Sequence, residues 1–242
     1  MASNRSAPEL SSARIVRHAG ILSGQLQSLR ERMYPPEAQK SLRSFMTNEV
    51  SRLTSIPEST LKTMSLEGKG PAPARLDNNH RVYALDQVNE LREMFANAKP
   101  QEALRFLPRR RKGEHLQVIG IANFKGGSAK TTTSVHLCHY LALHGYRVLA
   151  VDLDPQASLS AMFGAQPEMD VGENETVYAA LRHDENRRPI SEVIRRTYFA
   201  GVDLIPGNIE VMEYEHEIPR VLSGSGKGGA LFFEQLREAL RQ

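Results

Sequence analysis

Residues 118–151 combine three patterns that together restrict the fold: an apolar run, a glycine-rich loop and a helical repeat. Residues 118–122 are apolar and have the length of a buried parallel strand. The loop follows directly, and residues 131–144 then place apolar side chains at helical spacing up to Gly145, a residue that commonly ends helices. Residues 146–151 are the next expected strand. In such a unit the loop N–H groups and the helix N-terminus converge on an anion, so the sequence predicts a phosphate site in an α/β fold.

The loop departs from the general phosphate-loop pattern G-x-x-x-x-G-K-[ST]. Phe124 and Ala129 replace its two outer glycines, and a second lysine, Lys125, lies five residues before the loop lysine, Lys130. The backbone at Ala129 matters, because a Cβ is harmless at negative φ but costs about 1 kcal/mol or more in the left-handed region. A second glycine-rich segment, residues 224–229, follows no apolar strand, and we interpret it as a connector.

The block Lys-Gly-Gly-Ser-Ala-Lys-Thr-Thr resembles the deviant phosphate loop of the ParA/MinD ATPases. The resemblance implies ATP and Mg²⁺ as cofactors, and a homodimer that sandwiches two nucleotides. Lys130 would hold the β and γ phosphates, Thr131 the Mg²⁺ and Thr132 the α phosphate. Lys125 would reach the phosphates of the ATP bound to the other subunit. The residues that the resemblance assigns to cofactor binding are Gly126, Gly127, Ser128, Ala129, Lys130, Thr131 and Thr132.

Asp152 and Asp154 follow the second expected strand and add to this resemblance. Side chains at positions i and i+2 of a strand share a face, so both carboxylates can point to the C-terminal end of the strand, where parallel sheets bind ligands. By resemblance, Asp154 would orient the attacking water and Asp152 would lie near the metal through a water. The predicted catalytic residues are therefore Lys125, Lys130 and Asp154. Relatives with an N-terminal DNA-binding extension can carry a bulky residue at the position of Ala129, so we expect ATP binding to be retained.

Positive charge is concentrated in the N-terminal half of the chain. Residues 1–115 contain 19 Lys and Arg against 12 Asp and Glu, a net +7, whereas the whole chain is +3, which leaves −4 for residues 116–242. Such an excess is the electrostatic footprint of contact with phosphate backbones, although a solvated basic face produces it too. The charge distribution alone does not decide between the two.

Residues 41–98 have the pattern of a winged helix-turn-helix domain. We expect a helix at 48–53 with Thr47 as its N-cap, a second helix from Pro57, a wing hairpin that ends in Arg81-Val82-Tyr83, and a further helix capped by Asp86. This order of elements resembles the MerR-type winged helix-turn-helix, which implies DNA binding. Residues at the start of the second helix and in the wing would contact DNA. They are Ser59, Thr60, Lys62, His80 and Arg81.

Two segments flank this domain. Residues 1–40 contain a heptad seam, in which spacings of four and three alternate. Its members are Ile15, Ala19, Leu22, Leu26, Leu29 and Met33. Gly20 and Gly24 each cost about 1 kcal/mol against alanine in a helix. A dimerisation helix and an amphipathic helix docked on its own domain both remain open. Residues 99–115, with four consecutive basic residues, are interpreted as a basic linker.

Residues 116–242 fit the N-terminal half of a ParA-type ATPase domain. Such ATPases need an apolar strand that ends in an acidic residue, and we find none after residue 206, while residues 231–240 fit the helix that precedes it. We therefore expect a truncated chain, an incomplete parallel sheet and no measurable ATP hydrolysis by this polypeptide alone. Asp203 is expected on a short strand.

The combined pattern is most similar to the partition ATPases of the RepABC plasmid systems. It implies an ATP-dependent dimer that binds DNA, moves plasmids with a centromere-binding partner of the ParB/RepB type and represses its own operon. The alternative is a transcription repressor whose nucleotide site only senses ATP or ADP, and a nonfunctional gene remnant is a third reading. The N-terminus lacks a signal sequence and no run reaches 18 apolar residues, so we expect a cytoplasmic protein without a membrane partner.

Overall fold

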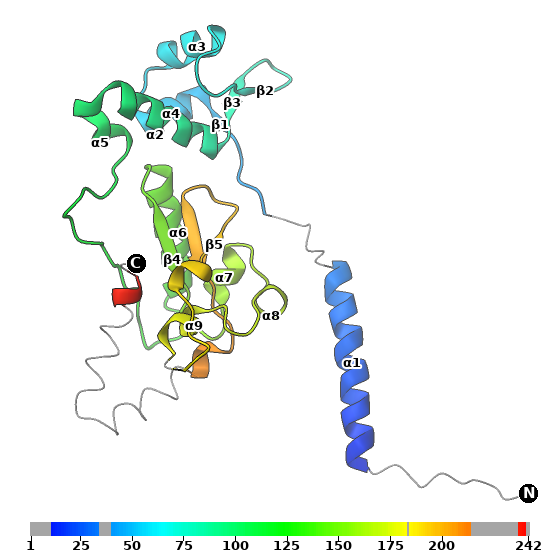
Figure 1. Ribbon diagram of the computed structural model, residues 1–242. Helices are drawn as coiled ribbons and strands as arrows, with labels where there is room; N and C mark the ends of the chain where they lie inside the picture. The colour runs from blue at the N-terminus through cyan, green and yellow to red at the C-terminus, as the bar shows by residue number, and fades with distance from the viewer. Residues whose placement is uncertain (1–10, 34–39, 183, 214–236, 241–242) are drawn as a thin grey trace, which may run out of the picture. The chain divides into compact units, whose positions relative to one another are not determined.

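The computed structural model describes residues 11–33, 40–182, 184–213 and 237–240 (Figure 1). The chain divides into two compact units, residues Met1–Gln39 and Lys40–Gln242. Among the helices that the model describes, none is long and apolar enough to cross a membrane.

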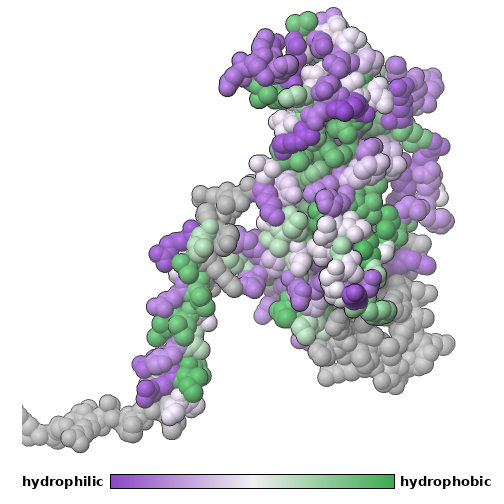
Figure 2. Space-filling view, turned by 180° about the vertical axis from the view of Figure 1, so that it is seen from behind, coloured by the Kyte–Doolittle hydropathy of each residue, from purple (hydrophilic) through white to green (hydrophobic). Residues whose placement is uncertain are grey.

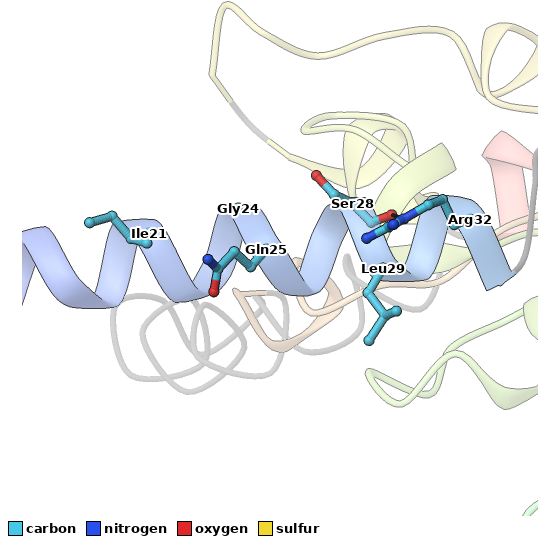
Figure 3. A pocket seen from close by; sticks show the side chains of 6 residues that line it. All are labelled: Ile21, Gly24, Gln25, Ser28, Leu29 and Arg32. Carbon is cyan, nitrogen blue, oxygen red and sulfur yellow. Dashed lines mark hydrogen bonds between the residues drawn. The ribbon is translucent and has the colours of Figure 1, made fainter.

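The first unit contains one helix, α1 (Ser11–Met33), so the helix predicted there is confirmed. A Cβ added at Gly20 or Gly24 would meet nothing within 4 Å. The large apolar residues of the heptad seam are exposed, from 45% for Leu29 to 68% for Ile15, and Figure 2 shows hydrophobic residues along this helix. A shallow hollow is lined by residues of α1 alone, so it is the outer surface of a helix rather than a ligand cavity (Figure 3).

The second unit begins with three antiparallel strands and three helices. The strand order in this sheet is β1-β3-β2. In chain order the elements are β1 (Phe45–Met46), α2 (Thr47–Thr54), α3 (Glu58–Leu66), β2 (Ala74–Arg75), β3 (Arg81–Tyr83) and α4 (Leu85–Ala98). The helix pair and the hairpin predicted within residues 41–98 are therefore present.

Helix α2 begins one residue earlier than predicted. Met46, rather than Thr47, precedes the helix, and its backbone N–H donates to Glu49 Oε2 at 2.8 Å. The cap is thus supplied from the third helical position, as the acidic half of a capping box does. Ser55, with φ 59°, then turns the chain towards α3, and Ile56 anchors this turn with 1% of its surface exposed.

Helix α4 also begins differently from the prediction. Ala84 precedes it and donates its N–H to Gln87 Oε1 at 2.9 Å, while the expected cap, Asp86, lies inside the first turn. The Gln87 side chain, at the third helical position, thus accepts the backbone N–H of the residue before the helix, which would otherwise bond to water.

The segment predicted as a linker is folded at its start. It contains the short helices η1 (Pro100–Glu102) and α5 (Ala103–Phe106). Phe106 is 3% exposed, and its ring centroid lies 5.5 Å from that of Phe95 on α4. Burial of this aromatic ring holds the first turns of the segment against the preceding helix.

The rest of the second unit contains a three-stranded sheet with the order β4-β6-β5. β4 and β6 are parallel and β5 is antiparallel to β6, so the expected parallel sheet is mixed. Helix α6 packs against β4 and α7. In chain order the elements are α6 (Lys130–Leu143), β4 (Val148–Val151), α7 (Ser158–Met162), α8 (Pro167–Asp170), α9 (Val177–Leu181), η2 (Ile190–Glu192), β5 (Arg195–Arg196) and β6 (Val202–Ile205). The helix after the loop, the next strand and the short strand of Asp203 are confirmed.

The strand predicted at residues 118–122 is not formed, and this prediction was wrong. The segment has no regular structure, and Val118 and Ile119 are 64% and 62% exposed. A strand needs hydrogen bonds to a neighbouring strand. Within the described part of the second unit, the sheet near the loop contains β4, β6 and β5 alone. The connector at 224–229 and residues 231–236 of the predicted C-terminal helix lie outside the described residues.

One apolar core extends through the second unit. Its buried members come from the N-terminal helix pair and from the sheet with α6 alike, and include Val50, Leu91, Val135, Ala150 and Leu204. A smaller cluster lies around α9 and β6. The helices α2 and α4 therefore share a core with α6, the helix that carries the loop at its N-terminus.

Candidate nucleotide site

The glycine loop is positioned by local hydrogen bonds and by the start of α6. Asn123 Oδ1 accepts from the Lys125 N–H at 2.9 Å, and the Thr133 N–H donates to the Ala129 carbonyl at 2.8 Å as the first turn of the helix forms. Gly127 has φ 69°, a conformation that glycine adopts without strain. The free N–H groups and the positive end of the 14-residue helix face this loop. Such an arrangement binds anions.

Ala129 is the N-cap of α6 and lies in the left-handed region, with φ 61° and ψ 24°. Of negative φ and the left-handed region, the structure therefore has the conformation that is unfavourable for a residue with a Cβ. A Cβ in this region costs roughly 1–2 kcal/mol. The strain lies at the residue that directs the first turn of α6, and strain of this kind is concentrated at functional loops.

The side chains of the loop differ in exposure. Lys125 and Thr132 are exposed, whereas Lys130 and Thr131 are half-buried. Ser128 Oγ is buried and has no hydrogen-bond partner among the described residues. A buried hydroxyl without a partner, next to a helix N-terminus, matches an acceptor-rich group such as a phosphate. The residues present therefore fit the phosphates of a nucleotide.

Asp152 is buried, with 3% of its surface exposed, and hydrogen bonds occupy both of its carboxylate oxygens. Oδ2 accepts from the Ser160 N–H at 2.8 Å and from Ser160 Oγ at 2.6 Å, and Oδ1 accepts from the Asp154 N–H at 3.2 Å. Ser160 Oγ in turn accepts from the Gly207 N–H at 2.9 Å. Asp152 therefore fixes the loop after β4 to α7 and to the segment that follows β6.

Asp154 lies half-buried in the same loop, and its Oδ1 accepts from the Gln156 N–H at 2.9 Å. Gly207 approaches this loop closely, because a Cβ built on it would lie 3.1 Å from Asp152 Cγ and from the Asp154 carbonyl oxygen. Ser160 and Gly207 are the positioning residues that sequence reasoning missed. The available signal was the glycine that follows β6 directly after Pro206.

Comparison with known proteins assigns a family to this arrangement. Residues 116–240 match a family model described as an AAA domain. A protein of Sinorhizobium fredii (strain NBRC 101917 / NGR234), named as a candidate replication protein A, is 46% identical over 229 residues, which cover 94% of this chain and 56% of that protein. Protein SopA of Escherichia coli (strain K12) is 30% identical over 188 residues, 76% of this chain and 46% of SopA. A ParA family protein of Chlamydia trachomatis (serovar D) is 34% identical over 119 residues, 44% of each chain.

The chain belongs to the ParA-type P-loop ATPase family. It spans about half the length of the curated relatives that it matches. In this ParA-type chain, α6 packs against β4 and α7. The glycine loop leads into α6, and the Asp152–Asp154 segment connects β4 to α7. The two parts of the candidate site are therefore carried by elements that are in contact.

The residues predicted to contact DNA lie on α3 and on the β2–β3 hairpin of this ParA-type chain. Ser59, Lys62 and His80 are exposed, whereas Thr60 and Arg81 are half-buried. Lys62 Nζ lies 3.4 Å from Glu58 Oε2, a pair exposed enough to be weak. Arg81 Nε donates to Ser65 Oγ at 3.0 Å, which ties the hairpin to α3.

Proposed function

We propose that this chain acts in plasmid partition as an ATP-dependent DNA-binding protein of the cytoplasm. The observation that carries the proposal is the loop itself. Lys125 precedes α6 and Lys130 is its first residue, the free N–H groups of the helix N-terminus lie beside the loop, and the buried hydroxyl of Ser128 has no partner among the described residues. Two strongly similar curated relatives are named for replication protein A, over more than nine-tenths of this chain.

In this proposal the loop binds ATP with Mg²⁺. Lys130 and Thr132 contact the phosphates, and Thr131 holds the metal. Lys125 is exposed, as a residue must be if it is to reach a nucleotide in a second copy of the chain. Asp154 orients water for hydrolysis, and Asp152 positions the loop through Ser160 in addition to its expected role beside the metal.

The proposal places DNA contact on α3 and the β2–β3 hairpin. The two helices α2 and α3 are joined by a three-residue turn, and the hairpin is tied to α3 through Arg81, as in a winged helix-turn-helix. Ser59, Lys62 and His80 have exposed side chains for base edges and phosphates. The net charge of +7 over residues 1–115 supports contact with a DNA backbone.

The proposed assembly is a homodimer that works with a centromere-binding partner of the ParB/RepB type. The exposed seam of α1 supports the dimer, since five large apolar residues on one helix are exposed in the single chain. The partner is proposed from the relatives, among which SopA and a ParA family protein match this chain.

A second function is a repressor whose nucleotide site senses ATP or ADP without significant hydrolysis. The observation that favours it is that residues 118–122 form no strand and that Val118 and Ile119 are exposed, because the loop then lacks the buried strand that would anchor it during turnover. ATP turnover that is abolished by Lys130→Ala would contradict this second function and support the first.

The experiment compares binding of the full chain to a duplex from the control region upstream of its own gene with ATP, with ADP and with neither, and measures DNA-stimulated ATP turnover in parallel. If Lys62 contacts a base, Lys62→Ala is expected to weaken binding of this duplex by about 1–3 kcal/mol. If Lys62 contacts a phosphate, the same substitution is expected to reduce the slope of the logarithm of the binding constant against the logarithm of the salt concentration by about 1. Lys69→Ala is the matched control, since Lys69 is exposed, pairs with Glu67 and lies beyond α3. Equal affinity for a scrambled duplex, unaffected by Lys62→Ala, would refute the DNA-binding proposal.

A further inference from the structure

Arg92 joins two helices of the predicted helix-turn-helix segment, α2 and α4, to α6 of the predicted ATPase segment. It lies on α4 and is 1% exposed. Its Nη2 donates to the Leu143 carbonyl at 2.5 Å and to the Leu53 carbonyl at 3.1 Å, and its Nη1 donates to Asn89 Oδ1 at 2.7 Å. Leu143 is the last residue of α6, and Leu53 lies in the last turn of α2. One guanidinium therefore holds the C-terminal ends of both helices.

The chemistry of this contact favours a rigid joint. The partners of Arg92 among the described residues are carbonyl oxygens and an amide, so its charge is stabilised by the negative ends of two helices rather than by a carboxylate. Burial lowers the pKa of Arg92 to about 10, and the group stays charged at neutral pH. Moving either helix end away would remove one of the three hydrogen-bond partners of a buried charge, which is unfavourable.

The packing around Arg92 requires a glycine at the end of α6. Gly145 has φ +90°, and a Cβ built on it would lie 3.1 Å from Arg92 Cδ and Nε and 3.2 Å from the Phe106 carbonyl oxygen. The chain after α6 thus passes in close contact with the stem of Arg92. The contact is built from backbone as well as side chain, and a larger residue at position 145 would separate the elements.

A second basic residue makes a similar link to α7. Lys40 Nζ donates to the carbonyls of Ala161 and Met162 at 2.8 and 3.0 Å, at the C-terminal end of that helix. Lys40 lies just before β1, and α7 follows the Asp152–Asp154 loop. Both helices beside the candidate phosphate site are therefore held at their C-terminal ends by cations from the segment that contains α2 and α3.

Helix α6 connects the two ends of this system. Its 14 residues span about 21 Å at 1.5 Å per residue, with the glycine loop at the N-terminus and Leu143 at the C-terminus. A continuous helix moves as a unit, so a shift of the loop on nucleotide binding also moves the C-terminal end of α6. Arg92 is hydrogen-bonded to that end through the Leu143 carbonyl.

We propose that Arg92 is a positioning residue that couples nucleotide binding at the loop to the placement of α2 and α3. The inference rests on the proposed function, because it assumes a nucleotide at the loop and DNA contact on α3. Lysine is not an equivalent of this residue, because Arg92 uses two nitrogens of a planar guanidinium to bond the Asn89 side chain and both carbonyls at once, and a point-like ammonium lacks this fixed geometry.

The test uses the full 242-residue chain with Arg92→Lys and Asn89→Ala, the latter removing the side chain that orients the guanidinium. Arg105→Lys is the matched control, because Arg105 donates to Glu102 and to the Ser55 carbonyl, the latter at 3.4 Å, and makes no hydrogen bond to α6 within the described residues. Circular dichroism establishes folding, and calorimetry measures ATP-Mg²⁺ affinity. Hydrogen exchange of residues 47–56, with and without ATP-Mg²⁺, reports coupling without DNA. Binding of the upstream duplex in both nucleotide states reports it with DNA.

In the unaltered chain and in Arg105→Lys, ATP-Mg²⁺ is expected to change duplex affinity by about fivefold or more and to change exchange at residues 47–56. In Arg92→Lys, ATP-Mg²⁺ is expected to change duplex affinity by less than about twofold and to leave exchange at residues 47–56 nearly unchanged, while ATP affinity is kept. Asn89→Ala is expected to reduce both effects in part.

If Arg92→Lys does not fold, the result for Asn89→Ala tests the inference. Folded variants that bind ATP and keep the full effect would overturn the inference. If the unaltered chain does not bind the duplex, DNA contact is refuted. The hydrogen-exchange data then still test whether Arg92 couples the loop to residues 47–56. If ATP-Mg²⁺ changes neither duplex affinity nor hydrogen exchange in the unaltered chain, both the coupling through Arg92 and the ATP dependence of the proposed function would be overturned.

Discussion

Ala129 shows how one residue can be compatible with a fold and still strain it. The sequence defined two outcomes for this position, and the left-handed one is observed, with φ 61°. Which outcome holds depends on how the loop enters α6, a property of backbone geometry that the motif alone does not encode. The neighbouring Gly127 has a similar φ of 69° without a Cβ to strain.

We predict that Ala129→Gly stabilises the chain by about 0.5–1 kcal/mol. Relief of the left-handed strain exceeds the added flexibility of the unfolded chain. Urea unfolding followed by circular dichroism measures the change. Ala142→Gly, in the last turn of the same helix and fully buried, is the control and should be destabilising by about 1 kcal/mol or more. Destabilisation by both substitutions would argue against strain at position 129.

The hydroxyl of Ser160 supports the second half of the site. It donates to Asp152 Oδ2 and accepts from the Gly207 N–H, and both partners are buried in this contact. We predict that Ser160→Ala lowers the free energy of unfolding by about 1–3 kcal/mol, because two buried polar groups lose a partner. Chemical denaturation measures it, with Ser158→Ala at the start of the same helix as control. A loss below about 0.5 kcal/mol, equal to the control, would contradict this role.

At the scale of elements, the sequence predicted those that depend on local pattern. The helix after the loop, the helix pair, the hairpin and α1 all appear, because helical periodicity, turn residues and caps act over short distances. The starts of α2 and α4 were misplaced because Glu49 and Gln87 cap from inside the helix. The strand predicted at residues 118–122 was wrong for a different reason. A strand forms only beside another strand, and the apolar pattern of one segment does not show whether a neighbouring strand is available.

The exposed seam of α1 leads to a prediction about assembly. We expect the paired substitution Leu22→Glu and Leu26→Glu to shift the chain towards monomer, because like charges would face each other in a helix pair. Sedimentation velocity over a concentration series measures the shift. Ser28→Glu, on the same helix but outside the seam, is the control. An unaltered chain that is monomeric at all concentrations would favour docking of α1 on its own domain.

At the scale of the whole molecule, the family was readable from the loop and the aspartates, whereas the way the parts join was not. The sequence suggested a helix-turn-helix domain, a linker and an ATPase domain. Instead, Phe106 and Arg92 bring residues from all three into one core with α6. A buried arginine that bonds to main-chain carbonyls leaves no pattern in the sequence, because its partners can be any residues. The joint is therefore visible only in three dimensions.

The central claim is that the loop before α6 binds nucleotide, and calorimetric titration of the full chain with ATP-Mg²⁺ tests it most directly. The account predicts saturable binding that Lys130→Ala weakens by about tenfold or more, since a half-buried cation beside the phosphates is lost. Lys62→Ala, which removes an exposed lysine on α3, should leave affinity unchanged within about twofold. No affinity up to millimolar ATP, or equal affinity in the Lys130→Ala variant, would contradict the account.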